Sequence, residues 1–166
     1  MGFVIMNCQN SKTISEEVYY IAPDNILFEF NTINRNTALN KIGHHLVKNN
    51  IAKSGVVGSA IEREKTSSTL LENKWAAIPH AETKYIDRSQ ISLLIAPKGI
   101  DWGTGLARLV FFMGFTQQEI QNISMNKIYH EFNELLEQKS VMEQLVNSKS
   151  NMNAEKVLMN FFLCRK

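Results

Sequence analysis

Segments with helical and with extended hydrophobic spacing alternate along the chain. Ile26-Leu-Phe-Glu-Phe30 is a short β-prone run that Pro23-Asp24-Asn25 opens. Apolar residues at helical spacing then predict one helix over 36–48 and a second over 54–65, with Val57, Ala60 and Ile61 of the second helix facing inward. Three apolar runs bounded by Pro or Gly predict strands at 75–78, 90–95 and 109–113. Because these runs are apolar at nearly every position, we expect a sheet that is covered on both faces.

Helical spacing returns after Gly114. Thr116-Gln-Gln-Glu119 and Ser140-Val-Met-Glu143 match the capping box, in which two side chains satisfy backbone groups at the start of a helix. Three apolar stripes accompany them: Met125, Ile128, Phe132 and Leu135; Val141, Leu145 and Val146; and Val157, Leu158, Phe161 and Phe162. The order of these elements predicts an α/β fold, a mixed β-sheet sandwiched between helices.

Length and charge narrow the class of protein. A chain of 166 residues has room for one domain, which we place at 21–166, while residues 1–20 lack a sustained period and are interpreted as a leader. With 18 basic and 16 acidic residues the net charge is only +2, which does not favour nucleic-acid binding. Cys8 and Cys164 have no metal-like spacing, and the start of the chain lacks a secretory signal. We therefore expect a cytoplasmic protein that does not insert into the membrane.

The four histidines differ in their settings. No P-loop, dinucleotide-binding glycine motif, nucleophile elbow or zinc-protease motif is present in the sequence. His44 and His45 are neighbours on a predicted helix, about 100° apart, and cannot face one metal together. We interpret them as part of a solvated helix face. His130 flanks an apolar stripe, where a partly buried structural histidine is expected.

His80 follows the apolar run Trp75-Ala-Ala-Ile-Pro79, so it should lie at the mouth of a sheet. Upstream, a predicted helix ends in Arg63 and Lys65 before the hydroxyl cluster Thr66-Ser-Ser-Thr69. Cations and hydroxyls of this kind can hold an anion. A neutral imidazole beside them could carry a phosphoryl group on nitrogen. Taken alone, the Ile-Pro-His tripeptide is a weak signal and favours a plain turn histidine.

Arg63-Glu-Lys, Ser68-Thr69, Ala77-Ile-Pro-His80 and Asp87 follow one another in the sequence. This series resembles the enzyme IIA domain of the fructose–mannitol class of the bacterial sugar phosphotransferase system. The resemblance spans about 21–162. Further matches are Pro23-Asp-Asn-Ile26, Gly99-Ile-Asp-Trp102 and a terminal helix at 140–145. The family's fold, a mixed sheet flanked by helices, agrees with the hydrophobic pattern.

The resemblance implies a phosphoryl relay. His80 would accept a phosphoryl group from the phosphocarrier protein HPr and pass it to an enzyme IIB domain, which phosphorylates the incoming sugar. Arg63 would steady the phosphoryl group, and Thr69 would donate a hydrogen bond to it. Asp87 would orient or bound the pocket. Such a relay needs no metal, nucleotide or other cofactor, and this domain would make no contact with nucleic acid.

The sequence also departs from the family pattern. Met125 stands where the family often has a second histidine, and Ala81 follows the active histidine where glycine is common. Residues 70–74 replace a glycine-rich turn, and the loop 103–107 looks altered. Losing the second histidine removes a donor that could stabilise the phosphoryl group.

Three interpretations stay open at this point. The retained Arg63, Thr69 and His80 favour a stand-alone transport component. The missing second histidine and the leader favour a regulatory enzyme IIA-like domain, belonging to or cut from a transcriptional regulator of sugar operons, with phosphorylation of His80 tuning its activity. The third interpretation is an α/β domain without activity.

Overall fold

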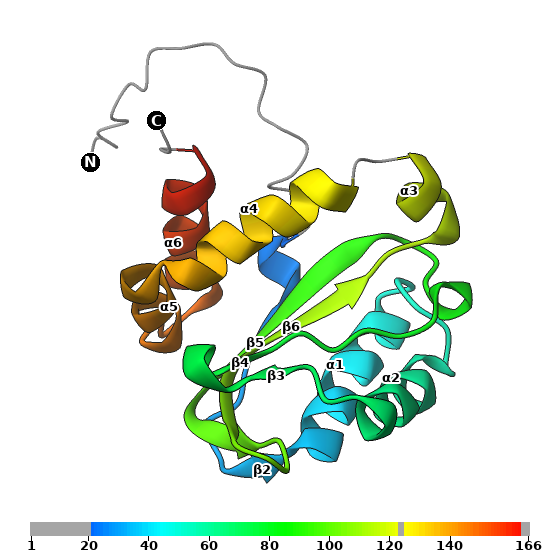
Figure 1. Cartoon of the computed structure of the whole chain (residues 1–166), viewed down its shortest axis with the longest axis horizontal. Coiled ribbons are helices and arrows are strands. Elements are labelled where there is room, and N and C mark those ends of the chain that lie inside the picture. Colours follow the sequence, from blue (N-terminus) through cyan, green and yellow to red (C-terminus); the bar gives the residue numbers. More distant parts are fainter. Residues whose placement is uncertain (1–20, 123–124, 164–166) are drawn as a thin grey trace.

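The fold is built on a mixed β-sheet. The structure is a computed structural model that describes residues 21–122 and 125–163, so the predicted leader lies outside the described residues. Within these residues the 6-stranded sheet has the order β1-β5-β6-β4-β3, with β2 paired to β5 (Figure 1). The strands are β1 (Ile26–Phe28), β2 (Ile33–Asn34), β3 (Leu70–Leu71), β4 (Ala76–Ala77), β5 (Gln90–Asp101) and β6 (Leu106–Gly114).

The pairing within the sheet is of both kinds. Strands β5 and β6 form an antiparallel pair at its centre, and β3 runs antiparallel to β4. Strands β1 and β2 run parallel to β5, and β4 runs parallel to β6. The prediction of a mixed sheet is therefore confirmed.

Helices cover both faces of this sheet. The α-helices are α1 (Arg35–Lys48), α2 (Val56–Thr66), α3 (Gln117–Asn122), α4 (Met125–Glu137), α5 (Lys139–Val146) and α6 (Asn151–Leu163); the short 3-10 turns are η2 (Pro23–Asn25), η3 (Glu72–Lys74) and η4 (Thr83–Tyr85). Figure 1 shows α1 and α2 on one side of the sheet and α4, α5 and α6 on the other. The predicted α/β sandwich is thus confirmed.

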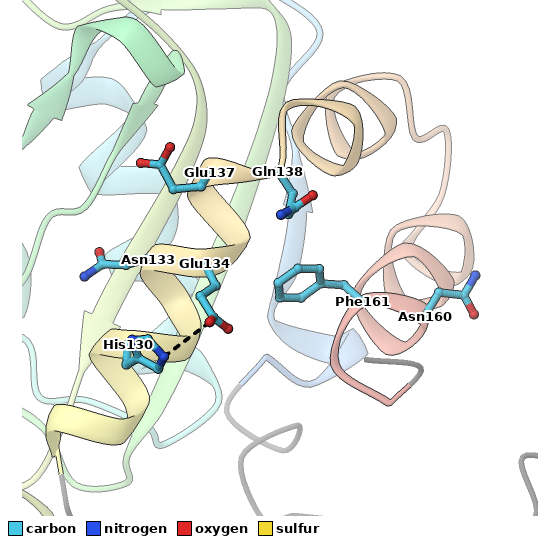
Figure 2. Close-up of a pocket in the computed structure, with 7 residues that line it drawn as sticks. All are labelled: His130, Asn133, Glu134, Glu137, Gln138, Asn160 and Phe161. Carbon is cyan, nitrogen blue, oxygen red and sulfur yellow. Dashed lines mark ion pairs between the residues drawn. The ribbon is translucent and has the colours of Figure 1, made fainter. Parts of the chain in front are cut away.

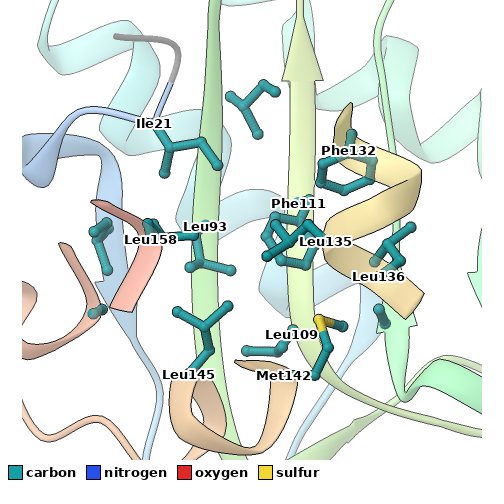
Figure 3. Close-up of a cluster of buried hydrophobic side chains, with 14 of the residues drawn as sticks. Ile21, Leu93, Leu109, Phe111, Phe132, Leu135, Leu136, Met142, Leu145 and Leu158 are labelled. Atoms are coloured by element: carbon teal, nitrogen blue, oxygen red, sulfur yellow. The ribbon is translucent and has the colours of Figure 1, made fainter. Parts of the chain in front are cut away.

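The core is divided by the sheet into two apolar layers. Leu93 and Phe111 face the layer under α4–α6 (Figure 3), where Phe111 meets Phe132 edge to face with ring centroids 4.9 Å apart. Leu94 and Val110, the next residues along the same strands, face the layer under α1 and α2. This alternation follows from the two-residue period of a strand, and it explains why β5 and β6 are apolar at successive positions.

Strand β5 extends beyond the predicted end at Ile95 and includes Pro97. The pairing with β6 shifts register between Ile95, opposite Leu109, and Ile100, opposite Ala107. Proline lacks the N–H that a ladder needs and is tolerated at such a bulge. The predicted end of this strand at residue 95, before a bounding proline, was therefore wrong.

One of the two predicted helix caps is wrong. At α3 the backbone N–H of Glu119 donates to Thr116 Oγ1 at 3.2 Å, which is one half of the capping box. The other half is replaced, because the N–H of Thr116 donates to Ser89 Oγ at 3.0 Å. At α5, however, Gln138 is the N-cap, and its carbonyl accepts from Met142 N at 3.0 Å. Only Gln138 separates α4 from α5, so α5 begins before Ser140 can cap it.

In the described part of the chain, no helix combines the length and the apolar character that crossing a membrane requires.

Candidate functional site

His80 is held at the point where the parallel pair β4–β6 ends. The N–H of Met113 in β6 donates to the carbonyl of Pro79 at 2.9 Å, and His80 itself forms a parallel bridge with Met113. Pro79 is buried, whereas His80 is partly exposed. The backbone on the inner side of the histidine is therefore fixed, and its ring reaches the surface.

Arg63 in the last turn of α2 contacts this ring directly. Its Nε–H donates to Nε2 of His80 at 3.0 Å. Because a guanidinium can only donate, Nε2 is the accepting nitrogen, and the proton of the neutral ring is on Nδ1. The structure thus brings together two of the residues that the sequence singled out, and it leaves the lone pair of Nε2 beside a permanent positive charge.

The pair borders a hollow of about 690 Å³ along α2. The lining residues come from one face of α2 and from the segment after β4: Gly55, Gly58, Ser59, Glu62, Arg63, Thr66, His80, Ala81, Glu82 and Tyr85. Ser59 Oγ accepts a hydrogen bond from Glu82 N at 2.9 Å. This bond joins α2 to the segment after β4, the two sides of the hollow. The Tyr85 ring packs so near Gly55 that a Cβ there would lie 2.2 Å from Tyr85 Cε1, which explains the glycine.

Both carboxylates of the hollow are paired with lysines. Glu62 Oε1 lies 2.6 Å from Lys65 Nζ, and Glu82 Oε2 lies 2.8 Å from Lys84 Nζ. The hydrogen bond from Lys84 to Glu82 raises the pKa of the lysine and keeps it charged. These two pairs are neutral in sum, so the charge of Arg63 gives this side of the hollow a positive balance.

Thr69 serves a different contact from the one predicted. Its hydroxyl donates to Glu64 Oε1, and its backbone N–H donates to Glu64 Oε2 at 3.1 Å. The carbonyl of Thr69 accepts from Ile78 N at 3.2 Å. Thr69 is not among the residues that line the hollow, and its one hydroxyl proton is directed to Glu64.

The structure does not bring Asp87 or Met125 into the hollow. Asp87 Oδ1 lies 3.5 Å from Lys53 Nζ, and the N–H of Asp87 donates to Ile51 O at 2.9 Å, because the turn η4 leads the chain away from His80. Met125 is the first residue of α4 and packs against the apolar layer under that helix.

Sequence reasoning missed Glu64, which is only 2% exposed. The buried residues of α2 are Val56, Ala60 and Glu64, whereas the predicted inward residues Val57 and Ile61 are only partly buried. A carboxylate four residues after Ala60 on the buried face was the available signal, since a buried carboxylate must be hydrogen-bonded.

A second hollow, also of about 690 Å³, lies between α4 and α6 (Figure 2). His130 lines it with its side chain 73% exposed, and its Nε2 lies 3.2 Å from Glu134 Oε1. The expected partial burial of His130 was therefore wrong, because its ring projects from the polar side of α4. His44 is exposed on α1, as expected of a solvated face, whereas its neighbour His45 is partly buried, which that interpretation did not foresee. In residues 21–122 and 125–163 no three His, Cys, Asp or Glu side chains gather as metal ligands.

These observations define a class of protein: an α/β domain that presents a histidine–arginine pair in an open hollow at the end of a parallel strand. The family model described as "Phosphoenolpyruvate-dependent sugar phosphotransferase system, EIIA 2" matches residues 20–160. The chain belongs to this family, and the resemblance seen in the sequence is confirmed.

Relatives and solved structures agree with this assignment. A mannitol-specific phosphotransferase enzyme IIA component of Staphylococcus aureus is 33% identical over 91 residues, which cover 52% of this chain and 62% of the relative. A mannitol-specific EIICBA component of Buchnera aphidicola is 28% identical over 101 residues, 59% of this chain but only 16% of the relative. The Escherichia coli complex of enzyme IIA and phosphorylated enzyme IIB for mannitol contains a chain with the same fold, with a TM-score of 0.70 at 20% identity over 84% of this chain and 96% of that chain. The match thus spans less than two thirds of either curated relative.

Proposed function

We propose that this chain is a phosphoryl relay of the sugar phosphotransferase system. His80 accepts a phosphoryl group from HPr and passes it to an enzyme IIB domain that serves sugar uptake. The observation that carries the proposal is the hydrogen bond of 3.0 Å from Arg63 Nε to His80 Nε2 in an open hollow. Membership of the EIIA 2 family supports the same chemistry.

The resting geometry favours Nε2 of His80 as the nucleophile, because it holds the lone pair. Nε2 attacks the phosphorus of the phosphorylated carrier, a nitrogen–phosphorus bond forms, and the bond from phosphorus to the carrier breaks with its electron pair returning to the carrier. The ring keeps its Nδ1 proton in this step. Arg63 exchanges its contact with Nε2 for contacts with the phosphoryl oxygens, whose negative charge it stabilises.

Transfer to enzyme IIB is the same displacement in the other direction, with the acceptor attacking the phosphorus held on His80. An acceptor of this kind is supported by the solved complex of the mannitol enzyme IIA with phosphorylated enzyme IIB. The curated relatives are mannitol-specific components of the phosphotransferase system, which favours the relay over the regulatory alternative. A role of Asp87 in the pocket gains no support, because Asp87 pairs with Lys53 instead.

The proposal is tested by incubating the chain with enzyme I, HPr and phosphoenolpyruvate. We expect a phosphate that is labile in acid and stable in base, as a phosphohistidine is, and that is absent from His80→Ala. Adding an enzyme IIB domain of the mannitol class should then remove the label. A wild-type chain that takes up no phosphate would refute the relay.

His130→Ala is the matched control for the site. His130 also lines a hollow of about 690 Å³ and is even more accessible, but its ring is paired with a carboxylate rather than with an arginine. This variant should take up as much label as the wild type. Label that disappears with His130 and persists without His80 would show that the wrong hollow was chosen.

A further inference from the structure

Glu64 is a charged side chain that the relay chemistry does not use. It lies one residue after Arg63 in α2, is 2% exposed, and accepts three hydrogen bonds from neutral donors. Taking a carboxylate out of water is strongly unfavourable unless such bonds replace the lost hydration. The position of these donors therefore indicates what the residue does.

The three donors belong to two separate segments beside the sheet. Oε2 of Glu64 accepts from Thr69 N at 3.1 Å and from Trp102 Nε1 at 2.9 Å, and Oε1 accepts from the Thr69 hydroxyl. Thr69 directly precedes β3, and Trp102 directly follows β5. The carboxylate thus joins the last turn of α2 to both segments.

A continuous path runs from this carboxylate to both members of the proposed site. On one side, Glu64 is the covalent neighbour of Arg63, whose Nε meets His80 Nε2 at 3.0 Å. On the other side, Thr69 O accepts from Ile78 N at 3.2 Å, and Ile78 lies two residues before His80. We infer that Glu64 is a positioning residue that sets the register of Arg63 against His80. This inference rests on the proposed relay function.

In this arrangement the positioning of Arg63 depends on the shape of the hydrogen-bonding group of Glu64 rather than on its charge. In Glu64→Gln an amide oxygen at the Oε2 position would keep both N–H donors. The amide NH₂ at the Oε1 position could donate to the Thr69 hydroxyl oxygen, since a hydroxyl both donates and accepts. Glu64→Asp keeps the charge but is one methylene shorter, so it cannot reach all three donors.

Two measurements on the full chain test the inference. The first is the rate of phosphoryl uptake from phosphorylated HPr. The second is the ¹⁵N spectrum of the His80 ring without phosphate, at a pH where the ring is neutral, which reports whether the proton is on Nδ1. We expect Glu64→Gln to resemble the wild type in both. Glu64→Asp and Glu64→Ala should slow uptake by about tenfold, no more than the loss of the Arg63 contact itself would, and should give a mixture of tautomers.

Asn151→Ala is the control for a general loss of stability. Asn151 Nδ2 donates to Pro23 O and Ile26 O, both at 2.9 Å, and so braces α6 against the β1 side of the sheet. This variant should leave the His80 tautomer and the uptake rate unchanged, although it lowers stability.

The inference is overturned if Glu64→Asp and Glu64→Ala keep the wild-type rate and tautomer, or if Asn151→Ala changes both to the same degree. It is overturned equally if Glu64→Gln changes the rate and the tautomer as much as Glu64→Ala does, since the charge of Glu64 would then be what positions Arg63. A wild-type chain that takes up no phosphate would refute the relay function instead, and the ring spectrum would still decide the role of Glu64.

Discussion

Arg63→Ala should slow phosphoryl uptake by His80 about 10- to 30-fold. The substitution removes the donor that lies 3.0 Å from His80 Nε2 and the charge that would face the phosphoryl oxygens. A hydrogen bond with a charged partner contributes about 1.5–3 kcal/mol. Arg63 is exposed, so solvent screens its charge and the lower part of this range applies, about 1.5–2 kcal/mol. Since about 1.4 kcal/mol changes a rate tenfold, the stated loss follows.

Arg63→Lys separates charge from geometry. Lysine keeps the positive charge, but its ammonium is a point charge on a flexible stem and cannot reproduce the planar donor that meets His80. Its uptake rate should therefore lie between those of the wild type and Arg63→Ala. The assay is single-turnover transfer from phosphorylated HPr, with the carrier below saturation so that transition-state stabilisation is measured.

Arg88→Ala is the matched control among the arginines. Arg88 Nη2 contacts Asn49 O at 3.4 Å and does not line the hollow, so its removal should not change the rate. Wild-type uptake by Arg63→Ala would contradict the assigned role of Arg63. An equal loss in Arg88→Ala would show that the effect is one of overall charge.

Three further predictions concern stability, measured as the free energy of unfolding in urea. Gly43→Ala should destabilise the protein by about 1–3 kcal/mol because its Cβ would lie 2.2 Å from Val57 Cγ2. Gly58→Ala has open space around its Cβ and should stabilise the protein by about 0.5–1 kcal/mol. Equal effects of the two substitutions would contradict the packing of α1 against α2. Asn50 has φ 55° in the left-handed cap that ends α1. Asn50→Val should therefore lower the stability by about 1–2 kcal/mol, while Asn50→Gly should change it little. An equal loss of stability in both variants would refute the strain argument. The hydrogen bond from the Asn31 N–H, and then the contact with Lys41, lower the pKa of Glu29. Glu29→Gln should therefore lose about 1 kcal/mol of stability above the usual pKa of 4.5, and this loss should vanish as the pH falls through the lowered pKa. A loss of stability that persists at low pH would exclude this linkage.

Periodicity predicted the helices best where one face is buried continuously. The stripe Ile128, Phe132 and Leu135 in α4 is buried as its spacing indicates, because a helix on a sheet must cover one apolar face. The end of β5 could not be predicted in this way. Pro97 and Gly99 interrupt the apolar run there, and only the pairing with β6 shows that the strand continues through a bulge.

The candidate site was accessible to sequence reasoning only in part. Arg63 and His80 could be singled out by their places at the ends of a helix and a strand, but their contact depends on how α2 lies against the sheet, which no spacing reveals. Asp87 shows that closeness in the sequence does not place a residue in the hollow. It is near His80 in the sequence, but the turn η4 directs it to Lys53.

The last turn of α2 connects the core of the protein to its surface site. Successive residues of a helix point about 100° apart, so Arg63 can face the hollow while Glu64 faces the layer under α1 and α2. Trp102, 1% exposed, belongs to that layer and binds Glu64. Packing changes there should therefore alter the contact between Arg63 and His80, whereas equal losses of stability under α4–α6 should not. The site would then depend on one core layer of the sandwich rather than on the stability of the whole domain.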